Sequence, residues 1–177
     1  RVLLEGVHGP LLDIDNGSYP YVTSSSPSIG GACTGLGLNP QAIKGVLGVF
    51  KAYSTRVGSG PMPSEITGDE AEEIREKAQE FGVTTGRARR IGWFDGVAAK
   101  YSQLINGFTG IVLTRLDILD EFDSVKVCVG YEVNGERVDR FPANTGLLAR
   151  CQPIFEEMPG WDQPTASATE LSQLPEN

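Results

Sequence analysis

The chain is poor in the residues that many small catalytic and metal centres use. Its 177 residues include one histidine, His8, and three widely separated cysteines, Cys33, Cys128 and Cys151. A single histidine argues against a zinc site and against a Ser-His-Asp triad. Three dispersed cysteines without a C-x-x-C motif argue against a disulfide framework and favour a reducing compartment. We therefore expect a cytoplasmic protein.

Long apolar runs and an excess of positive charge are also lacking. The sequence contains neither the roughly 18 consecutive apolar residues typical of a membrane span nor a signal peptide. The formal net charge of −8 argues against nucleic acid and anionic membrane as partners, because both attract a basic surface. It leaves room for a small anion in a local pocket. The phosphate-binding pattern G-x-x-x-x-G-K-[ST] is absent, so these residues contain no P-loop.

What is present is the composition of one globular domain. Hydrophobic residues make up 40% of the chain and charged residues 21%. A domain of this size buries about 70% of its unfolded surface, which is enough for a core. The chain opens on the apolar run RVLLEG without an initiator methionine and closes on LSQLPEN without a terminating helix. We expect residues 1–177 to be a single partial domain of a longer protein.

Segments with helical periodicity alternate with apolar and alternating segments typical of strands. This order predicts an α/β layered fold, with a largely parallel central sheet flanked by helices and an appended antiparallel hairpin. The hairpin is predicted at Asn134-Gly135, a strong turn signal. The predicted segments are a buried strand at 1–6, a functional loop at 9–37, helices at 40–50, 69–81 and 95–105, a buried strand at 110–117 and the hairpin at 125–141.

The most informative stretch is FGVTTGRARRIGW, residues 81–93, which gathers three arginines in an acidic chain. A guanidinium presents a planar fork to a carboxylate or phosphate, and threonine hydroxyls beside a glycine complete an anion cradle. Each charge-assisted hydrogen bond contributes roughly 1.5–3 kcal/mol. The stretch therefore predicts an anion site. A solvated basic turn between two helices is the alternative, and composition alone weighs the two equally.

Two weaker candidates lie elsewhere. Asp117 ends a predicted parallel strand, where a carboxylate points into the ligand crevice of an α/β sheet and can accept the paired N–H donors of guanine. A strand-ending aspartate in a turn is the commoner case. His8, flanked by glycines, and the hydroxyl run 23–26 could contact a ligand, whereas a structural histidine and an ordinary polar loop are the alternatives.

Six blocks taken together resemble the adenylosuccinate synthetase family over nearly the whole chain. They are LLDIDNGSYPYVTSS, GLGLNPQ, KAYSTRVGSGP, EFGVTTGRARRIGW, LTRLDILD and EEMPGW. The resemblance implies an incomplete P-loop-NTPase-like ligase core that joins IMP to L-aspartate through a 6-phosphoryl-IMP intermediate, at the expense of GTP. It also implies Mg²⁺ and a homodimer. The family's phosphate loop, catalytic aspartate, catalytic histidine and magnesium ligands would lie outside these residues, so we expect no certain catalytic residue here and little activity from the isolated piece.

The resemblance assigns a ligand to each matching position. IMP would be bound by His8, Thr23 and Arg87. L-Aspartate would be bound by Val83, Thr84, Thr85, Gly86, Arg87, Ala88 and Arg89. GTP would be bound by Arg89, Arg115, Leu116 and Asp117.

Two positions depart from the family pattern. His8 stands where the family usually carries an amide, and Arg115 stands where it usually carries a lysine; the two cations are not interchangeable at a tight site. Both positions handle purines, so a relative that acts on dGMP is an alternative within the family. A purine-nucleotide-binding module without catalysis is an alternative of another class. The arginine and threonine stretch argues against a purely structural interaction domain.

Overall fold

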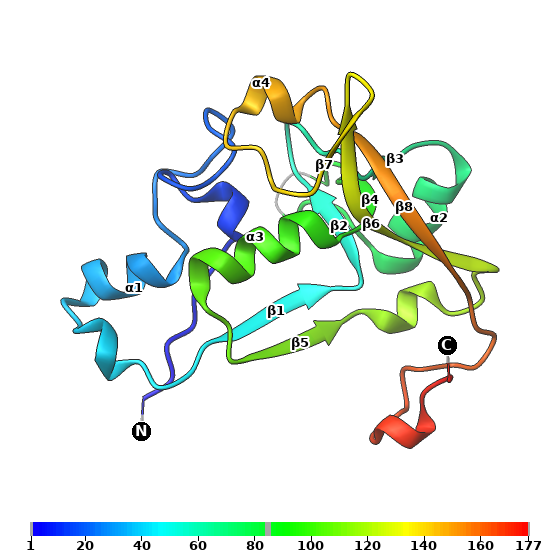
Figure 1. The fold of residues 1–177 in the computed structure, drawn as a ribbon. Helices are drawn as coiled ribbons and strands as arrows, with labels where there is room; N and C mark the ends of the chain where they lie inside the picture. The colour runs from blue at the N-terminus through cyan, green and yellow to red at the C-terminus, as the bar shows by residue number, and fades with distance from the viewer. Residues whose placement is uncertain (1, 84–85, 177) are drawn as a thin grey trace.

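The structure is a computed structural model that describes residues 2–83 and 86–176, and it has a mixed α/β fold (Figure 1). The helices of the described chain are α1 (Ile29–Leu36), α2 (Asp69–Ala78), α3 (Gly96–Asn106) and α4 (Thr145–Leu148). The strands are β1 (Leu47–Lys51), β2 (Tyr53–Arg56), β3 (Glu65–Ile66), β4 (Arg90–Asp95), β5 (Gly110–Thr114), β6 (Ser124–Val133), β7 (Glu136–Val138) and β8 (Gln152–Pro159). Short 3₁₀ helices are interspersed at Pro10–Leu12, Pro40–Ala42, Leu116–Leu119 and Leu171–Gln173.

The strands form two sheets. One sheet consists of β1 and β5, which pair in parallel. The other sheet has six strands: β2, β4, β6 and β7 are neighbours in that order, β3 pairs with β4, and β8 pairs with β6. The predicted α/β class and the hairpin at Asn134-Gly135 are confirmed, with positive φ at both turn residues. Among the described strands, parallel pairing is limited to β1–β5 and β4–β6, less than the largely parallel sheet we predicted. Short connections, such as the β6–β7 turn, impose antiparallel pairing because a parallel pair needs a long crossover.

The chain passes from one sheet to the other at a single residue, Ala52. Lys51 ends β1 and Tyr53 begins β2, while the backbone N–H of Ala52 still donates to the carbonyl oxygen of Thr114 at 2.9 Å. Figure 1 shows β1 and β5 side by side, with β2 continuing from β1 into the larger sheet. The carboxyl ends of β1 and β5 therefore lie at the junction of the two sheets.

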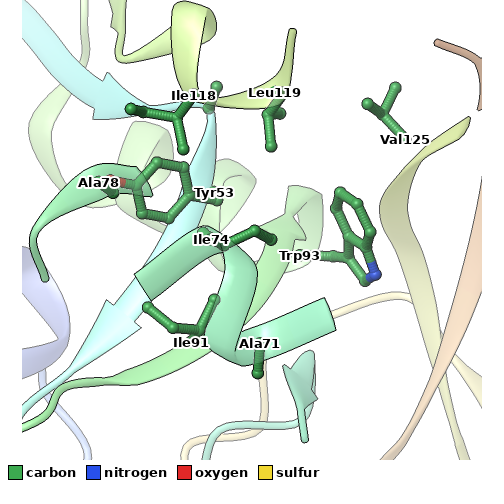
Figure 2. Close-up of a cluster of buried hydrophobic side chains, with 10 residues drawn as sticks. Tyr53, Ala71, Ile74, Ala78, Ile91, Trp93, Ile118, Leu119 and Val125 are labelled. Atoms are coloured by element: carbon green, nitrogen blue, oxygen red, sulfur yellow. The ribbon is translucent and has the colours of Figure 1, made fainter. Parts of the chain in front are cut away.

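The principal core lies between α2 and the larger sheet (Figure 2). The sequence pattern predicts a buried helical stripe of Ala71, Ile74, Ala78 and Phe81. The first three are buried as α2 packs against Ile91 and Trp93, whereas Phe81 lies beyond the end of α2 and is 37% exposed. Acidic residues in the first turn and basic residues in the last complement the helix dipole of α2. This packing fixes the end of α2 relative to β2 and β4, which matters for the site described below.

A second core cluster lies under α3 and contains buried polar groups. Asp95 caps α3 by accepting from the backbone N–H of Ala98 at 2.9 Å, and the Tyr131 hydroxyl donates to the same carboxylate at 2.7 Å. Burial raises the pKa of Asp95, an effect that these hydrogen bonds oppose. All three cysteines are free, as predicted, and burial raises the pKa of Cys128 to about 12. The Cys128 thiol is therefore a packed core group and not a reactive one.

Three local predictions are wrong. Residues 40–50 do not form a helix: a 3₁₀ turn is followed by β1, because Gly48 lets the Phe108 ring pack on the backbone where a Cβ would come within 2.8 Å. The predicted strand at 1–6 does not form over described residues 2–6, which are exposed. The predicted buried strand β5 exposes its apolar side chains, since Ile111 is 64% exposed.

The N-terminal tract folds around one buried carboxylate. Asp13 is fully buried and accepts hydrogen bonds from the backbone N–H groups of Asp15, Asn16 and Ser28, at 2.9–3.2 Å. Burial alone would raise the pKa of Asp13, but hydrogen bonds with Ser28 and the backbone lower it. The tract 9–37 is therefore ordered by a local hydrogen-bond centre, and it contains α1, which the sequence did not predict.

Asp13→Ala in the full-length protein is expected to lower the free energy of unfolding by about 1–3 kcal/mol at pH 7, because buried N–H donors lose their acceptor. Because the folded pKa is depressed, the stabilisation by Asp13 is present above the unfolded pKa and is lost as pH falls through the folded value. The deficit of the variant should therefore shrink in acid. Denaturant titration at several pH values measures the difference in free energy of unfolding between the wild type and the variant. Asp15→Ala, which changes an exposed neighbour, is the control. An equal loss from both variants would contradict the role of Asp13.

Candidate functional site

Of the three clustered arginines, Arg87 and Arg89 lie in a loop between α2 and β4, and Arg90 is the first residue of β4. We call residues 81–89 the arginine loop. The backbone N–H of Gly82 donates to the carbonyl oxygen of Arg87 at 2.8 Å, and that of Arg89 donates to the carbonyl oxygen of Glu80 at 3.0 Å. These bonds pin the two ends of the loop together next to the last turn of α2.

The described residues in the middle of the loop are exposed to solvent. Thr84 and Thr85, both predicted to bind aspartate, lie outside the described residues. Gly86 has φ +65°, a left-handed conformation that favours glycine. The remaining predicted aspartate-binding residues that precede Arg89 are exposed and so accessible to a ligand: Val83, Gly86, Arg87 and Ala88.

Arg89 is half-buried and held by a carboxylate that the sequence analysis did not single out. Its Nη1 donates to Glu80 Oε2 at 2.6 Å, and the Glu80 side chain is only 5% exposed. The other oxygen of Glu80 accepts from Lys51 Nζ at 2.8 Å and from the Tyr53 hydroxyl at 2.7 Å. Among the described residues, Arg89 Nε is buried without a hydrogen-bond partner. A buried carboxylate thus receives three donors from three segments.

The surroundings of Glu80 keep it ionised. Burial alone would raise its pKa, but hydrogen bonds from Lys51, Tyr53 and Arg89 lower it below its ordinary value. Burial, together with the bond to Glu80, raises the pKa of Tyr53 to about 12. Tyr53 therefore remains protonated at neutral pH and acts as a donor to the carboxylate.

Arg115 joins the same group from the end of β5. A hydrogen bond with Tyr53 raises the pKa of its guanidinium, which also donates to the carbonyl oxygen of Ala78 in α2. Arg115 has φ +63°, uncommon for a non-glycine residue, and this turns the chain out of β5. Two predicted ligand-binding arginines, one from the arginine loop and one from the strip after β5, therefore meet in one network. We call it the Glu80 cluster: Lys51, Tyr53, Glu80, Arg89 and Arg115.

The Glu80 cluster lies at the carboxyl edge of the parallel strands. Lys51 and Thr114 are the last residues of β1 and β5 and are register partners. Arg115 follows directly, and Asp117 stands in the first turn of the 3₁₀ helix Leu116–Leu119. Open α/β sheets bind ligands at this edge. The structure therefore places the predicted strip of Arg115, Leu116 and Asp117 where a ligand site is expected.

A hollow of about 380 Å³ opens beside this strip. Arg115, Leu116 and Asp117 line one side of it, and the C-terminal tract, including Thr165 and Leu171, lines the other. Its volume is in the range of small-molecule sites. Both polar and apolar residues line it.

Asp120, which was not predicted as a site residue, binds the C-terminal tract next to the strip of Arg115, Leu116 and Asp117. Its buried carboxylate accepts from Trp161 Nε1 at 2.7 Å and from the N–H and hydroxyl of Thr165, each at 2.9 Å. Burial would raise the pKa of Asp120, but the bonds from Thr165 and Trp161 lower it. The sequence signal was the pair of aspartates in LDILD, of which only Asp117 was interpreted.

Thr23 and His8, the two predicted IMP contacts in the N-terminal tract, are distant from the Glu80 cluster in sequence. Neither takes part in the hydrogen bonds described above for that cluster. Thr23 is half-buried, with its backbone N–H donating to Leu12 at 2.8 Å. The tract is tied to β2, since Arg56 donates to the carbonyl oxygen of Tyr21 at 3.0 Å. His8 is exposed and has φ +71°. Thr23 thus lies in a tract tied to β2, and His8 lies on an exposed segment, so the binding of IMP by these two residues stays a prediction.

Within residues 2–83 and 86–176, no group of three or more His, Cys, Asp and Glu side chains could hold a metal ion. No helix within the same range is long and apolar enough to cross a membrane.

The fold and the Glu80 cluster together define a mixed α/β protein with a cationic cluster at the carboxyl edge of parallel strands, the edge at which open α/β sheets bind ligands. The comparison with known proteins identifies the family. The sequence profile described as adenylosuccinate synthetase matches residues 1–177, and the chain belongs to this family.

Relatives at about half identity support the same assignment. The chain is 53% identical over 175 residues to an adenylosuccinate synthetase of Picosynechococcus sp. and 51% identical over 176 residues to that of Geotalea daltonii. It covers 40% and 41% of those two proteins, so it spans about two fifths of their length. A solved structure of fully ligated adenylosuccinate synthetase from Plasmodium falciparum matches 97% of this chain and 42% of its own, with a TM-score of 0.93 and 38% identity.

Proposed function

We propose that the full-length protein is an adenylosuccinate synthase, a ligase that joins IMP and L-aspartate at the expense of GTP in the synthesis of AMP. The observation that carries this proposal is the Glu80 cluster. It ties the arginine loop to the strip after β5, so that an anion site and a base-sized hollow share one buried support. The proposal includes a cytoplasmic homodimer with no nucleic-acid or membrane partner.

The arginine loop would bind the amino acid. L-Aspartate carries two carboxylates, and the exposed Arg87 and the half-buried Arg89 offer guanidinium forks to them. The threonines at 84 and 85 and the backbone of Val83, Gly86 and Ala88 would complete the cradle. Because arginines grip only the carboxylates, the amine is left to point at the purine. Positioning of this kind contributes several kcal/mol to lowering a barrier.

The purines would bind on either side of this loop. Asp117 would accept the N1–H and N2–H₂ donors of guanine in the 380 Å³ hollow, with Arg115 and Leu116 against the ring. Arg89 would reach the GTP side as well. Thr23 would contact the phosphate of IMP, His8 its hypoxanthine ring, and Arg87 both IMP and aspartate.

The reaction would proceed in two balanced steps. The γ-phosphoryl group of GTP passes to O6 of IMP while N1 loses its proton, which releases GDP and makes the phosphorylated O6 a leaving group. The aspartate amine then attacks C6, the C6–O bond breaks with departure of phosphate, and the amine loses a proton. The arginines would stabilise the charge that develops on the departing phosphate. Magnesium would neutralise the phosphates of GTP, and the described residues do not supply a cluster of ligands for it.

The test is an assay of the full-length protein for conversion of IMP to adenylosuccinate, with product separated by chromatography. We expect turnover only when GTP and L-aspartate are both present. Parallel reactions replace IMP with dGMP, the substrate that the changes at His8 and Arg115 bring into question. Turnover with dGMP alone would replace the proposal with the variant activity. Purine-nucleotide binding without any turnover would replace it with a non-catalytic binding module.

A further inference from the structure

We propose that Glu80 is a positioning residue that presets the two ligand-binding arginines. Its carboxylate would hold Arg89 directly and Arg115 through the Tyr53 hydroxyl, so that the aspartate and guanine subsites share one support. The inference rests on the proposed function, because it takes Arg89 and Arg115 as ligand-binding residues. It adds to that function a residue that touches no ligand.

The backbone geometry supports this role. Helix α2 ends at Ala78, and Gln79 takes a left-handed conformation with φ +54°. The chain therefore turns at the next residue, and Glu80 points into the protein instead of continuing along the exposed helix surface. Its carbonyl oxygen accepts from the backbone N–H of Arg89, and its carboxylate accepts from the Arg89 side chain. Glu80 thus fixes both the base of the arginine loop and the direction of the loop's last arginine.

The second arginine is reached through Tyr53. The Tyr53 ring is buried at the start of β2, and its hydroxyl lies 2.7 Å from Glu80 Oε1. Tyr53 also interacts with Arg115, the residue that directly follows β5, and this interaction raises the pKa of the Arg115 guanidinium. Glu80 and Tyr53 are buried, so neither is placed to touch a ligand, whereas Arg89 and Arg115 retain exposed surface. The pair is therefore placed to orient binding groups and not to bind.

The charge balance explains why a carboxylate is needed there. Lys51, Arg89 and Arg115 approach closely enough for the two arginines to lower the pKa of Lys51 in addition to its burial. Three like charges at one junction repel one another unless a buried anion holds them. The Glu80 carboxylate binds Lys51 and Arg89 directly and attracts Arg115, and the cluster still keeps a net positive charge. The excess remains available to a dianionic amino acid or a nucleotide.

The test compares steady-state kinetics of the full-length wild type with those of Glu80→Gln. We expect the KM for L-aspartate and the KM for GTP to rise about tenfold or more, because charge-assisted contacts to misplaced arginines weaken. The KM for IMP should change less than twofold. Tyr53→Phe should raise the KM for GTP more than that for aspartate, since it removes the hydroxyl between Glu80 and Arg115 and leaves the bond between Glu80 and Arg89 in place. The matched control is Glu65→Gln, which neutralises the partner of the adjacent Arg90, bound at 2.7 Å.

A double-mutant cycle separates positioning from general stability. If Glu80 acts through Arg89, adding Glu80→Gln to Arg89→Ala should leave the KM for aspartate unchanged. An additive effect, or an equal rise in every KM, would overturn the inference. If Glu80→Gln does not fold, Glu80→Asp keeps the charge and moves it back by one methylene. This variant should also raise the KM values for L-aspartate and GTP while changing the KM for IMP little. An active wild type with unchanged Glu80 variants would overturn this inference alone, whereas an inactive wild type would overturn the proposed function with it.

Discussion

Arg87→Ala in the full-length protein is expected to lower kcat/KM for L-aspartate by about 10²–10⁴-fold. Arg87 lies at the exposed side of the arginine loop, where it would grip a substrate carboxylate and contact IMP. Loss of two charge-assisted hydrogen bonds at roughly 1.5–3 kcal/mol each corresponds to this range. Initial rates at varied aspartate, with GTP and IMP saturating, measure the effect.

Two variants make the Arg87 experiment specific. Arg87→Lys keeps the positive charge but loses the fork, so it should retain only part of the activity. Arg140→Ala removes an exposed arginine that follows β7 and should leave kcat/KM unchanged. Full turnover by Arg87→Ala would remove the aspartate-binding role of the loop and with it the central part of the ligase proposal.

The elements that the sequence predicted well are those whose periodicity and caps agree. A helix was predicted over 95–105, and α3 spans Gly96–Asn106 with Asp95 as its N-cap and Gly107 as its C-cap. A helix was also predicted over 69–81, but α2 ends at Ala78. Propensity favoured continuation, whereas tertiary contacts of Glu80 with Lys51 and Tyr53 favoured an earlier exit. A local pattern cannot report contacts with residues about 30 positions away.

The burial of β5 was predicted wrongly for a related reason. Its run Ile111, Val112 and Leu113 is apolar on both faces, as in a strand covered on two sides. Here β5 pairs with β1 alone, and all three side chains are more than 40% exposed. An apolar pattern reflects the surroundings of a strand in the whole protein, and this chain spans about two fifths of the length of its relatives.

The candidate site was predictable where a residue's chemistry is unusual for its context. Three arginines in an acidic chain, and an aspartate after an apolar strand, stand out in a sequence. Glu80 and Asp120 do not, because acidic residues are common at helix ends and in turns. Their importance comes from burial, since each is a carboxylate in a water-poor junction with three donors. Burial of a single charged residue has no local signature and must be found in the fold.

Asp117→Asn in the full-length protein is expected to raise the KM for GTP by about 10²–10³-fold and to leave any weak use of ATP nearly unchanged. The carboxylate of Asp117 can accept both the N1–H and the N2–H₂ of guanine, whereas an amide opposes one of these donors with its own NH₂. A site built to bond a polar edge loses affinity steeply when a buried group is left unpaired. Kinetics with GTP and ATP as alternative phosphoryl donors measure the change.

The chemistry of the base offers a rescue that a merely damaged pocket would not show. Xanthosine triphosphate carries a carbonyl oxygen at C2 in place of the amino group, so the amide NH₂ of Asp117→Asn can donate to it. The variant should therefore use xanthosine triphosphate better than the wild type does. Asp123→Asn, an exposed aspartate six positions further along, should alter neither nucleotide. If Asp117→Asn used GTP as well as the wild type, the guanine would have to be read elsewhere, and the hollow beside β5 would lose its assignment while the aspartate site of the arginine loop would stand.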